Sequence, residues 1–290
     1  MALAANAAYQ TTAKGFAVDT LSCHFLAAPD AKVPFDITVQ QLNDGGRFCS
    51  RVATLHQSGS LKVHVTCSFV RPSSMTGSSM THSVQRRSHQ KIDAITLDDL
   101  APGRTDIGPY MKFQRLPLLC TGPANNTPSD PQPEHLLYTS AAQISPLGTS
   151  DDRSILHHLA LIALSDYHIL DCPPTVHGRA VGKPDINAPQ DQTQPIDSDF
   201  TFMTSLNHSI RFHGHDGFRT DEVLYVEANC PWTRGRRAQV DSRIFCGAGR
   251  LLATCAQEAY FVMKGEAEQR EERRWVMDKE AKRDGEKSRL

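Results

Sequence analysis

The segment Leu61–Phe69, LKVHVTCSF, decides the first element of the fold because apolar and polar side chains alternate along it. A period of two is typical of a β-strand in a sheet with one buried face. On both sides of this segment, further strand-like runs fill residues 16–72, separated by Asn43–Gly46 and Ser58–Ser60. Glycine readily adopts the positive φ of tight reversals, so both separators are predicted to be hairpin turns.

The composition is that of an ordinary globular protein with room for two domains. The chain has 290 residues, and its 31 basic side chains against 32 acidic ones give a net charge of −1. A balanced charge argues against nucleic acid as the main partner. No run of about 18 apolar residues occurs, so no membrane span is expected.

Eight cysteines stand singly, without a CxxC pair that would indicate a metal or redox site. Several lie within apolar strand-like runs, and we expect reduced, mostly buried thiols. They are Cys23, Cys49, Cys67, Cys120, Cys172, Cys230, Cys246 and Cys255.

The periodicity divides the chain into four parts. Residues 1–72 are read as a first unit, in which only the alanine-rich stretch Ala2–Ala8 is helical. Residues 73–109 are polar and serine-rich, which is typical of a linker. Residues 110–263 form a second unit, and residues 264–290 form a charged, solvated tail.

The second unit contains the strongest helix signal, at residues 151–169. Ser150 is a suitable N-cap, and Ile155, Leu159 and Ile162 form one apolar stripe. The next position on that stripe is Asp166, so a carboxylate is predicted on the buried face. A strand-like HLLYTSAAQI precedes this helix. A polar loop at residues 171–199 and four strand-like segments follow it, so each half reads as a helical segment followed by four strands.

Several separated motifs together resemble the acyl-CoA thioesterase II family. They are TLSCHFLAAPD at residues 20–30, LALIALSDY at 159–167, SLNHSIRFH at 205–213 and LLATCAQEAYF at 251–261. The resemblance implies an α+β double hot-dog fold: two antiparallel sheets, each wrapped on a central helix and paired edge to edge within one chain. Since the family chain begins earlier, it also implies that the first hot-dog is N-terminally incomplete.

The resemblance places the catalytic groups in the second unit. The family's water-activating carboxylate matches Asp166, its hydroxyl residue matches Ser205, and its glutamine matches Gln257. Such a trio can hold a water molecule and accept its proton, which suits thioester hydrolysis without a covalent intermediate. One departure is Asn207, where the family pattern has aspartate.

Two other functions remain open. Hot-dog enoyl-CoA hydratases use an aspartate and a histidine five residues later, a spacing matched by Asp152 and His157. A catalytically impaired paralogue, acting as an interaction subunit, is the second alternative. The histidine pairs His157–His158 and His213–His215 lack further ligands at a recognisable spacing, so no metal is expected.

The expected partners follow from the same resemblance. Acyl-CoA is the substrate, no cofactor is implied, and a homo-oligomer is expected. The last three residues, Ser288, Arg289 and Leu290, resemble the S-K-L address that a peroxisomal import receptor reads, so we expect a peroxisomal location.

Overall fold

The computed structural model describes residues 1–78, 80–87, 95–102, 110–121, 132–145, 153–181, 198–215 and 217–265. Its N-terminal half contains one helix and four strands, in the order expected from the sequence. These elements are α1 (Ala2–Tyr9), β1 (Ala17–Phe25), β2 (Asp36–Asp44), β3 (Phe48–Gln57) and β4 (Ser60–Val70). The turn between β3 and β4 consists of Ser58 and Gly59, both at positive φ, as a two-residue hairpin requires.

In the described residues, the C-terminal half contains two α-helices and the remaining strands. Short strands come first: β5 (Ala101–Pro102), β6 (Met111–Arg115), β7 (Leu119–Cys120) and β8 (Leu136–Ile144). The helices α3 (Arg153–Leu164) and α4 (Cys172–Val176) follow. Four long strands complete this half: β9 (Phe200–Phe212), β10 (Leu224–Arg234), β11 (Arg237–Cys246) and β12 (Leu251–Met263). The four strands predicted after the helix are thus confirmed.

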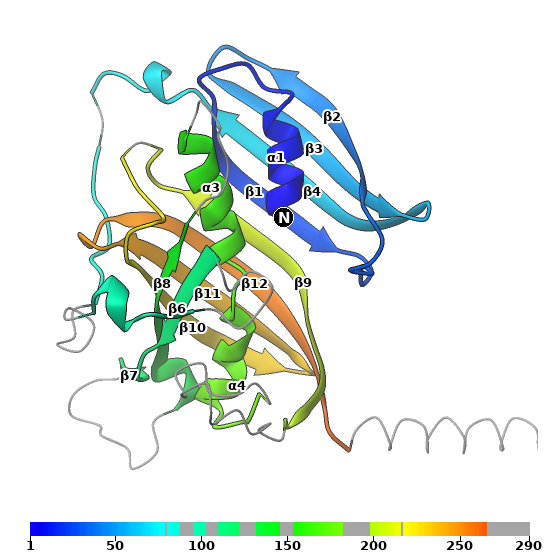
Figure 1. Cartoon of the computed structure of the whole chain (residues 1–290). Coiled ribbons are helices and arrows are strands. Elements are labelled where there is room, and N and C mark those ends of the chain that lie inside the picture. The colour runs from blue at the N-terminus through cyan, green and yellow to red at the C-terminus, as the bar shows by residue number, and fades with distance from the viewer. Residues whose placement is uncertain are drawn as a thin grey trace, which may run out of the picture.

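The twelve strands of the described residues belong to one antiparallel sheet. Its order is β2-β3-β4-β1-β9-β12-β11-β10-β8-β6-β5, with β7 paired to β8 (Figure 1). The two halves pair edge to edge where β1 meets β9, with Cys23 opposite His208. The β1–β9 ladder therefore joins the two halves into one continuous sheet, which is the edge-to-edge pairing expected from the sequence.

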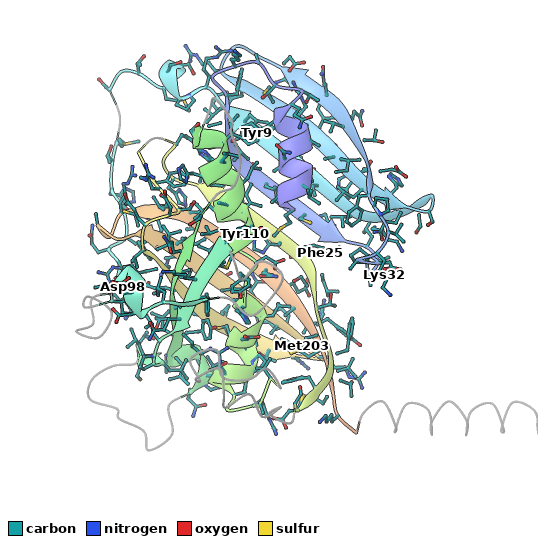
Figure 2. The ribbon with its side chains drawn as sticks, in the orientation of Figure 1. Tyr9, Phe25, Lys32, Asp98, Tyr110 and Met203 are labelled. Carbon is teal, nitrogen blue, oxygen red and sulfur yellow. The ribbon has the colours of Figure 1, made fainter. Side chains whose placement is uncertain are left out.

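Helices α1 and α3 lie against the same face of this sheet and contact each other (Figure 1). The face that these helices cover is called the inner face. Ala4, Ala5 and Ala8 of α1 are fully buried, so their small side chains let the helix approach the strands closely. Tyr9, labelled in Figure 2, packs edge-on against Phe69 and accepts a hydrogen bond from the Val18 amide at 2.7 Å. One hydrophobic core spans both halves.

The central helix is shorter than predicted. It ends at Leu164, whereas apolar periodicity indicated residues 151–169. The Ser165 hydroxyl oxygen lies 2.9 Å from the Ile162 carbonyl oxygen, and His168 adopts a left-handed φ of 56°, which an α-helix does not accommodate. Ser150 and Asp151, at its predicted start, lie outside the described residues.

Two segments predicted to be irregular contain ordered structure. The loop predicted at 171–199 begins with α4, whose first-turn prolines, Pro173 and Pro174, suit a helix start because their nitrogens need no partner there. In the predicted linker, Leu100 is buried and the Arg87 amide donates to Glu227 at 2.8 Å. This linker therefore contacts the sheet at β10.

All eight cysteines are free thiols, and six of them are buried, as expected. None of the described helices combines the length and the apolar composition needed to cross a bilayer.

Candidate active site

Asp166 lies in the turn that follows α3, and the turn is fixed on its N-terminal side by Ser165. Ser165 is almost fully buried, and its hydroxyl oxygen lies 3.0 Å from Nε2 of His208 on β9. Asp166 itself is partly exposed. The turn therefore holds a carboxylate at the inner face of the sheet while leaving it within reach of water.

An ion pair between the buried Asp171 and the partly exposed Arg115 fixes the C-terminal side of the same turn. Asp171 is completely buried, and its Oδ2 atom accepts from Arg115 Nη2 at 2.8 Å and lies 2.9 Å from His168 Nδ1. Tyr167 packs edge-on against Phe113 of β6, with 5.3 Å between ring centroids. Anchors on both sides leave Asp166 little conformational freedom.

A β-bulge in β9 directs Ser205 toward the inner face. Asn207 pairs with Glu258, but the next pair is Ser205 with Ala259, so Leu206 is an extra residue in β9. Strict alternation would place Ser205 on the same face as Asn207. The bulge reverses this orientation, as bulges beside functional sites commonly do.

Gln257 of β12 connects the other two predicted residues. Its side chain is 1% exposed, and its Nε2 atom lies 2.5 Å from Asp166 Oδ1 and 2.5 Å from Ser205 Oγ. An amide nitrogen carries two hydrogens, so one Gln257 donates to both oxygens. The structure thus brings together the three residues predicted from the resemblance.

His208 and two thiols surround this trio. Burial lowers the pKa of His208 from its ordinary value of 6.5, while the Asp166 carboxylate opposes that shift. Burial also raises the pKa of both Cys23 and Cys255 to about 12. Both thiols and His208 are therefore neutral near pH 7.

Asn207, where the family pattern has aspartate, lies on the face of the sheet opposite to the trio. Asn207 Nδ2 donates to Glu258 Oε2 at 2.9 Å, and Glu258 also accepts from Arg237 at 3.0 Å. Because an ionised aspartate has no hydrogen to donate to Glu258, the amide suits this position. The substitution leaves the trio on the inner face untouched.

The trio can hold and deprotonate a water molecule. Asp166 is a partly exposed carboxylate, and a general base must lie within hydrogen-bond reach of the proton it accepts. Ser205 Oγ accepts from Gln257 and, within the described part of the chain, bonds to neither a histidine nor a carboxylate. A serine nucleophile needs such a base, so the arrangement favours water as the attacking group.

Of the two residues of the hydratase alternative, the structure describes only His157, which is held by Thr220. His157 is buried, and its Nδ1 lies 3.0 Å from Thr220 Oγ1 and accepts from the Thr220 amide at 3.2 Å. Asp152 lies outside the described residues. The structured ranges hold no group of three or more potential metal ligands.

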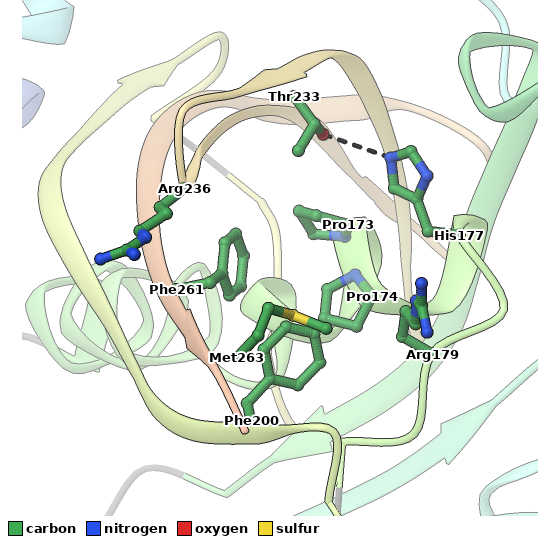
Figure 3. A pocket seen from close by; sticks show the side chains of 9 residues that line it. All are labelled: Pro173, Pro174, His177, Arg179, Phe200, Thr233, Arg236, Phe261 and Met263. Atoms are coloured by element: carbon green, nitrogen blue, oxygen red, sulfur yellow. Dashed lines mark hydrogen bonds between the residues drawn. The ribbon is translucent and has the colours of Figure 1, made fainter. Parts of the chain in front are cut away.

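A cavity of about 340 Å³ opens on the inner face of β9 and β12, the face that carries Ser205 and Gln257 (Figure 3). Phe261 and Met263 of β12 and Phe200 of β9 form one wall. By strand alternation Phe261 shares the inner face with Gln257, roughly 13 Å further along β12. The other lining residues are Pro173, Pro174, His177, Arg179, Thr233 and Arg236.

Sequence reasoning missed the residues that support the trio. Ser165, His208, Arg115 and Asp171 were not predicted to take part. Ser165 and His208 lie inside the quoted motifs, but no sequence pattern indicated that they would meet. Arg115 and Asp171 are 56 residues apart, and nothing in the sequence pairs them.

Two family models match the chain. The model described as the acyl-CoA thioesterase N-terminal domain matches residues 1–70, and the acyl-CoA thioesterase C-terminal domain matches residues 97–261. Together they cover most of the chain, including all three residues of the trio.

Individual relatives agree with this match. Acyl-coenzyme A thioesterase 8 of Rattus norvegicus is 26% identical over 263 residues, which are 87% of this chain and 75% of the relative. The mouse protein of the same name is 26% identical over 276 residues, covering 91% and 79%.

Solved structures share the fold. An acyl-CoA thioesterase II, TesB2, from Mycobacterium marinum superposes with a TM-score of 0.65 at 24% identity, covering 91% of this chain and 88% of that one. A protein of unknown function with a hot dog fold from Alicyclobacillus acidocaldarius gives 0.59 at 15% identity, covering 90% and 84%. The chain therefore has a hot-dog fold.

Proposed function

Because the chain belongs to the acyl-CoA thioesterase family, we propose that it hydrolyses fatty or related acyl-CoA through a water molecule held by Asp166, Ser205 and Gln257. The observation that carries this proposal is the Gln257 amide, which bonds both Asp166 and Ser205. The three groups come from three separate segments, so their convergence on one point supports a shared task.

The reaction proceeds by direct attack of water on the thioester carbonyl carbon. Asp166 accepts one proton of the water as its oxygen forms the new C–O bond. The tetrahedral intermediate then expels the CoA sulfur, which takes the proton back from Asp166 as the C–S bond breaks. Free acid and CoA are the products, and no covalent enzyme intermediate forms.

The cavity further along β9 and β12 is suited to the acyl group. Phe200, Phe261 and Met263 offer an apolar wall, and Phe261 shares the inner face of β12 with Gln257. A thioester placed at Asp166 would direct its acyl chain along this face. We assign the acyl chain to the cavity on that basis.

We further propose a double hot-dog arrangement. In each half one helix is followed by four long strands, first α1 with β1–β4 and then α3 with β9–β12. The boundaries proposed for these units are residues 1–72 and 110–263, with 73–109 as the linker and 264–290 as the tail. The site then belongs wholly to the second unit.

An assay with two substrates distinguishes the candidate functions. Purified protein is incubated with a saturated acyl-CoA and, separately, with a 2-enoyl-CoA. Release of free thiol from both supports the thioesterase, and hydration of the enoyl-CoA without thiol release supports the hydratase. Absence of both reactions favours the catalytically impaired interaction subunit.

We propose a peroxisomal location, carried by Ser288, Arg289 and Leu290, which lie outside the described residues. A fluorescent protein is fused to the N-terminus, with and without the last three residues. Punctate signal that becomes diffuse on deletion supports the import receptor as a partner. Diffuse signal from both fusions contradicts it.

We also propose a homo-oligomer. Strand β2 ends the sheet with one edge unpaired among the described strands, and Leu42 of β2 and Phe48 of β3 are about half exposed. Unpaired edges favour association with another strand. Light scattering on the purified protein should give a multiple of 32.0 kDa, and a monomer mass would contradict the proposal.

A further inference from the structure

His208 is buried next to the trio, in the middle of the sheet. It is 1% exposed and lies on β9, directly opposite Gln257 of β12 and Cys23 of β1. Its Nε2 atom lies 3.0 Å from Ser165 Oγ, in the residue before Asp166. One imidazole therefore links the two elements that carry Asp166 and Gln257.

The hydrogen bonds of Gln257 leave one of its atoms unused. Both amide hydrogens go to Asp166 and Ser205, while Gln257 Oε1 is buried without a partner among the described residues. His208 Nδ1 is also buried and has no partner in the same part of the chain. Opposed residues in an antiparallel pair have Cβ atoms about 4.5–5.5 Å apart, so these two atoms are natural partners.

The protonation of His208 determines whether the two atoms can bond. Ser165 can donate its hydroxyl hydrogen to the Ile162 carbonyl at 2.9 Å or to His208 Nε2 at 3.0 Å. When it donates to Nε2, a neutral imidazole carries its hydrogen on Nδ1, facing Gln257. Burial lowers the pKa of His208, and the neighbouring thiols of Cys23 and Cys255 are neutral, so Asp166 is the charged group beside it.

We propose that neutral His208 is a positioning residue for the thioesterase reaction, donating from Nδ1 to Gln257 Oε1 and accepting at Nε2 from Ser165. The bond fixes which end of the Gln257 amide faces Asp166 and Ser205. If the amide turned over, its oxygen would face the Asp166 carboxylate and neither side chain could donate. Hydrogen bonds then run in one direction: Ser165 donates to His208, His208 donates to Gln257, and Gln257 donates to Asp166.

Two substitutions separate positioning from packing. The amide introduced by His208→Asn lies near the former Nδ1 and can still donate to Gln257, whereas the amide introduced by His208→Gln lies near the former Nε2 and reaches Ser165. We expect His208→Asn to keep kcat within about threefold. His208→Gln should lower kcat about 10- to 100-fold with KM nearly unchanged, the size expected when a buried group loses its partner.

A packing role predicts the opposite order, because the shorter asparagine leaves the larger void. His158 on α3 is equally buried and provides the control, since His158→Asn and His158→Gln should lower the melting temperature without this split in kcat. Equal loss of kcat in both His208 variants, or greater loss in His208→Asn, would overturn the proposal.

The inference rests on the proposed function, so wild-type protein and Asp166→Asn are assayed alongside. If wild-type protein is active, Asp166→Asn is not, and both His208 variants are fully active, only the positioning role fails. If wild-type protein releases no thiol from any acyl-CoA, the proposed function fails, and the positioning role is overturned with it.

Discussion

Gln257 Nε2 lies 2.5 Å from Asp166 Oδ1, although 91 residues separate the two in the chain. One residue belongs to a strand in the middle of the sheet, and the other to the turn after α3. Their contact depends on the packing of the whole second half, so the site is a product of the fold rather than of a local motif.

Ser205 and Gln257 should contribute to one shared task. Ser205→Ala and Gln257→Ala each misplace the water, and we expect each to lower kcat less than Asp166→Asn does. Combining either with Asp166→Asn should add little, because groups that act as a unit are not additive. Steady-state kinetics of the single and double variants measure this. Multiplicative losses would indicate independent roles.

The ion pair between Arg115 and the buried Asp171 should be important for stability. Arg115→Met leaves the Asp171 carboxylate buried beside His168, and we expect a loss of about 3 kcal/mol in the free energy of unfolding. Arg237→Met is the control, since its pair with Glu258 is exposed and should contribute less than about 1 kcal/mol. Urea unfolding compares them, and equal losses would contradict the assignment of Arg115 as an anchor.

The strands could be predicted from the sequence because their signal is local. Alternation in residues 61–69 and in the last four strands depends only on neighbouring side chains, and all five strands are observed. The predicted end of the central helix was wrong because apolar periodicity continues past Leu164. The left-handed φ of His168 depends on tertiary structure, which the periodicity does not report.

The residues of the site were predicted through a resemblance, but their geometry could not be predicted from the sequence. Alternation in β9 places Ser205 on the face of Asn207, and only the extra residue Leu206 reverses it. A bulge is set by the pairing between two strands, so neither strand alone indicates it. His208 and Ser165 were missed for the same reason, since they meet only through long-range pairing.

The cavity wall should determine chain-length preference. Phe261→Ala enlarges the cavity, and we expect the preferred acyl-CoA to become longer. Each methylene that gains a buried site adds roughly 0.8 kcal/mol, or about fourfold in kcat/KM. Phe202 is a suitable control because it lies on the same strand pair but is 50% exposed. A panel of saturated acyl-CoA substrates tests this, and an unchanged profile in Phe261→Ala would remove the cavity from the substrate path.

The lowered pKa of His208 should make stability depend on pH in a defined direction. The unfolded imidazole titrates near 6.5, and the folded one titrates lower because burial disfavours its charged form. The contribution of His208 to the free energy of unfolding is therefore complete above pH 6.5 and is lost as the pH falls toward the pKa of the folded state.

The melting temperature of wild-type protein should fall more between pH 7 and pH 5.5 than that of His208→Asn. His213 also has a pKa lowered by burial, but it is present in both proteins and cancels. Identical falls in the two proteins would show that His208 does not titrate in this way.

The kcat of Asp166→Asn tests whether Asp166 is the general base. The amide keeps the volume of the carboxylate but accepts no proton, so kcat should fall about 10²- to 10⁴-fold with little change in KM and an unchanged circular dichroism spectrum. Full activity in a correctly folded Asp166→Asn would contradict the account, as would a greater loss in Ser205→Ala accompanied by a burst of free CoA.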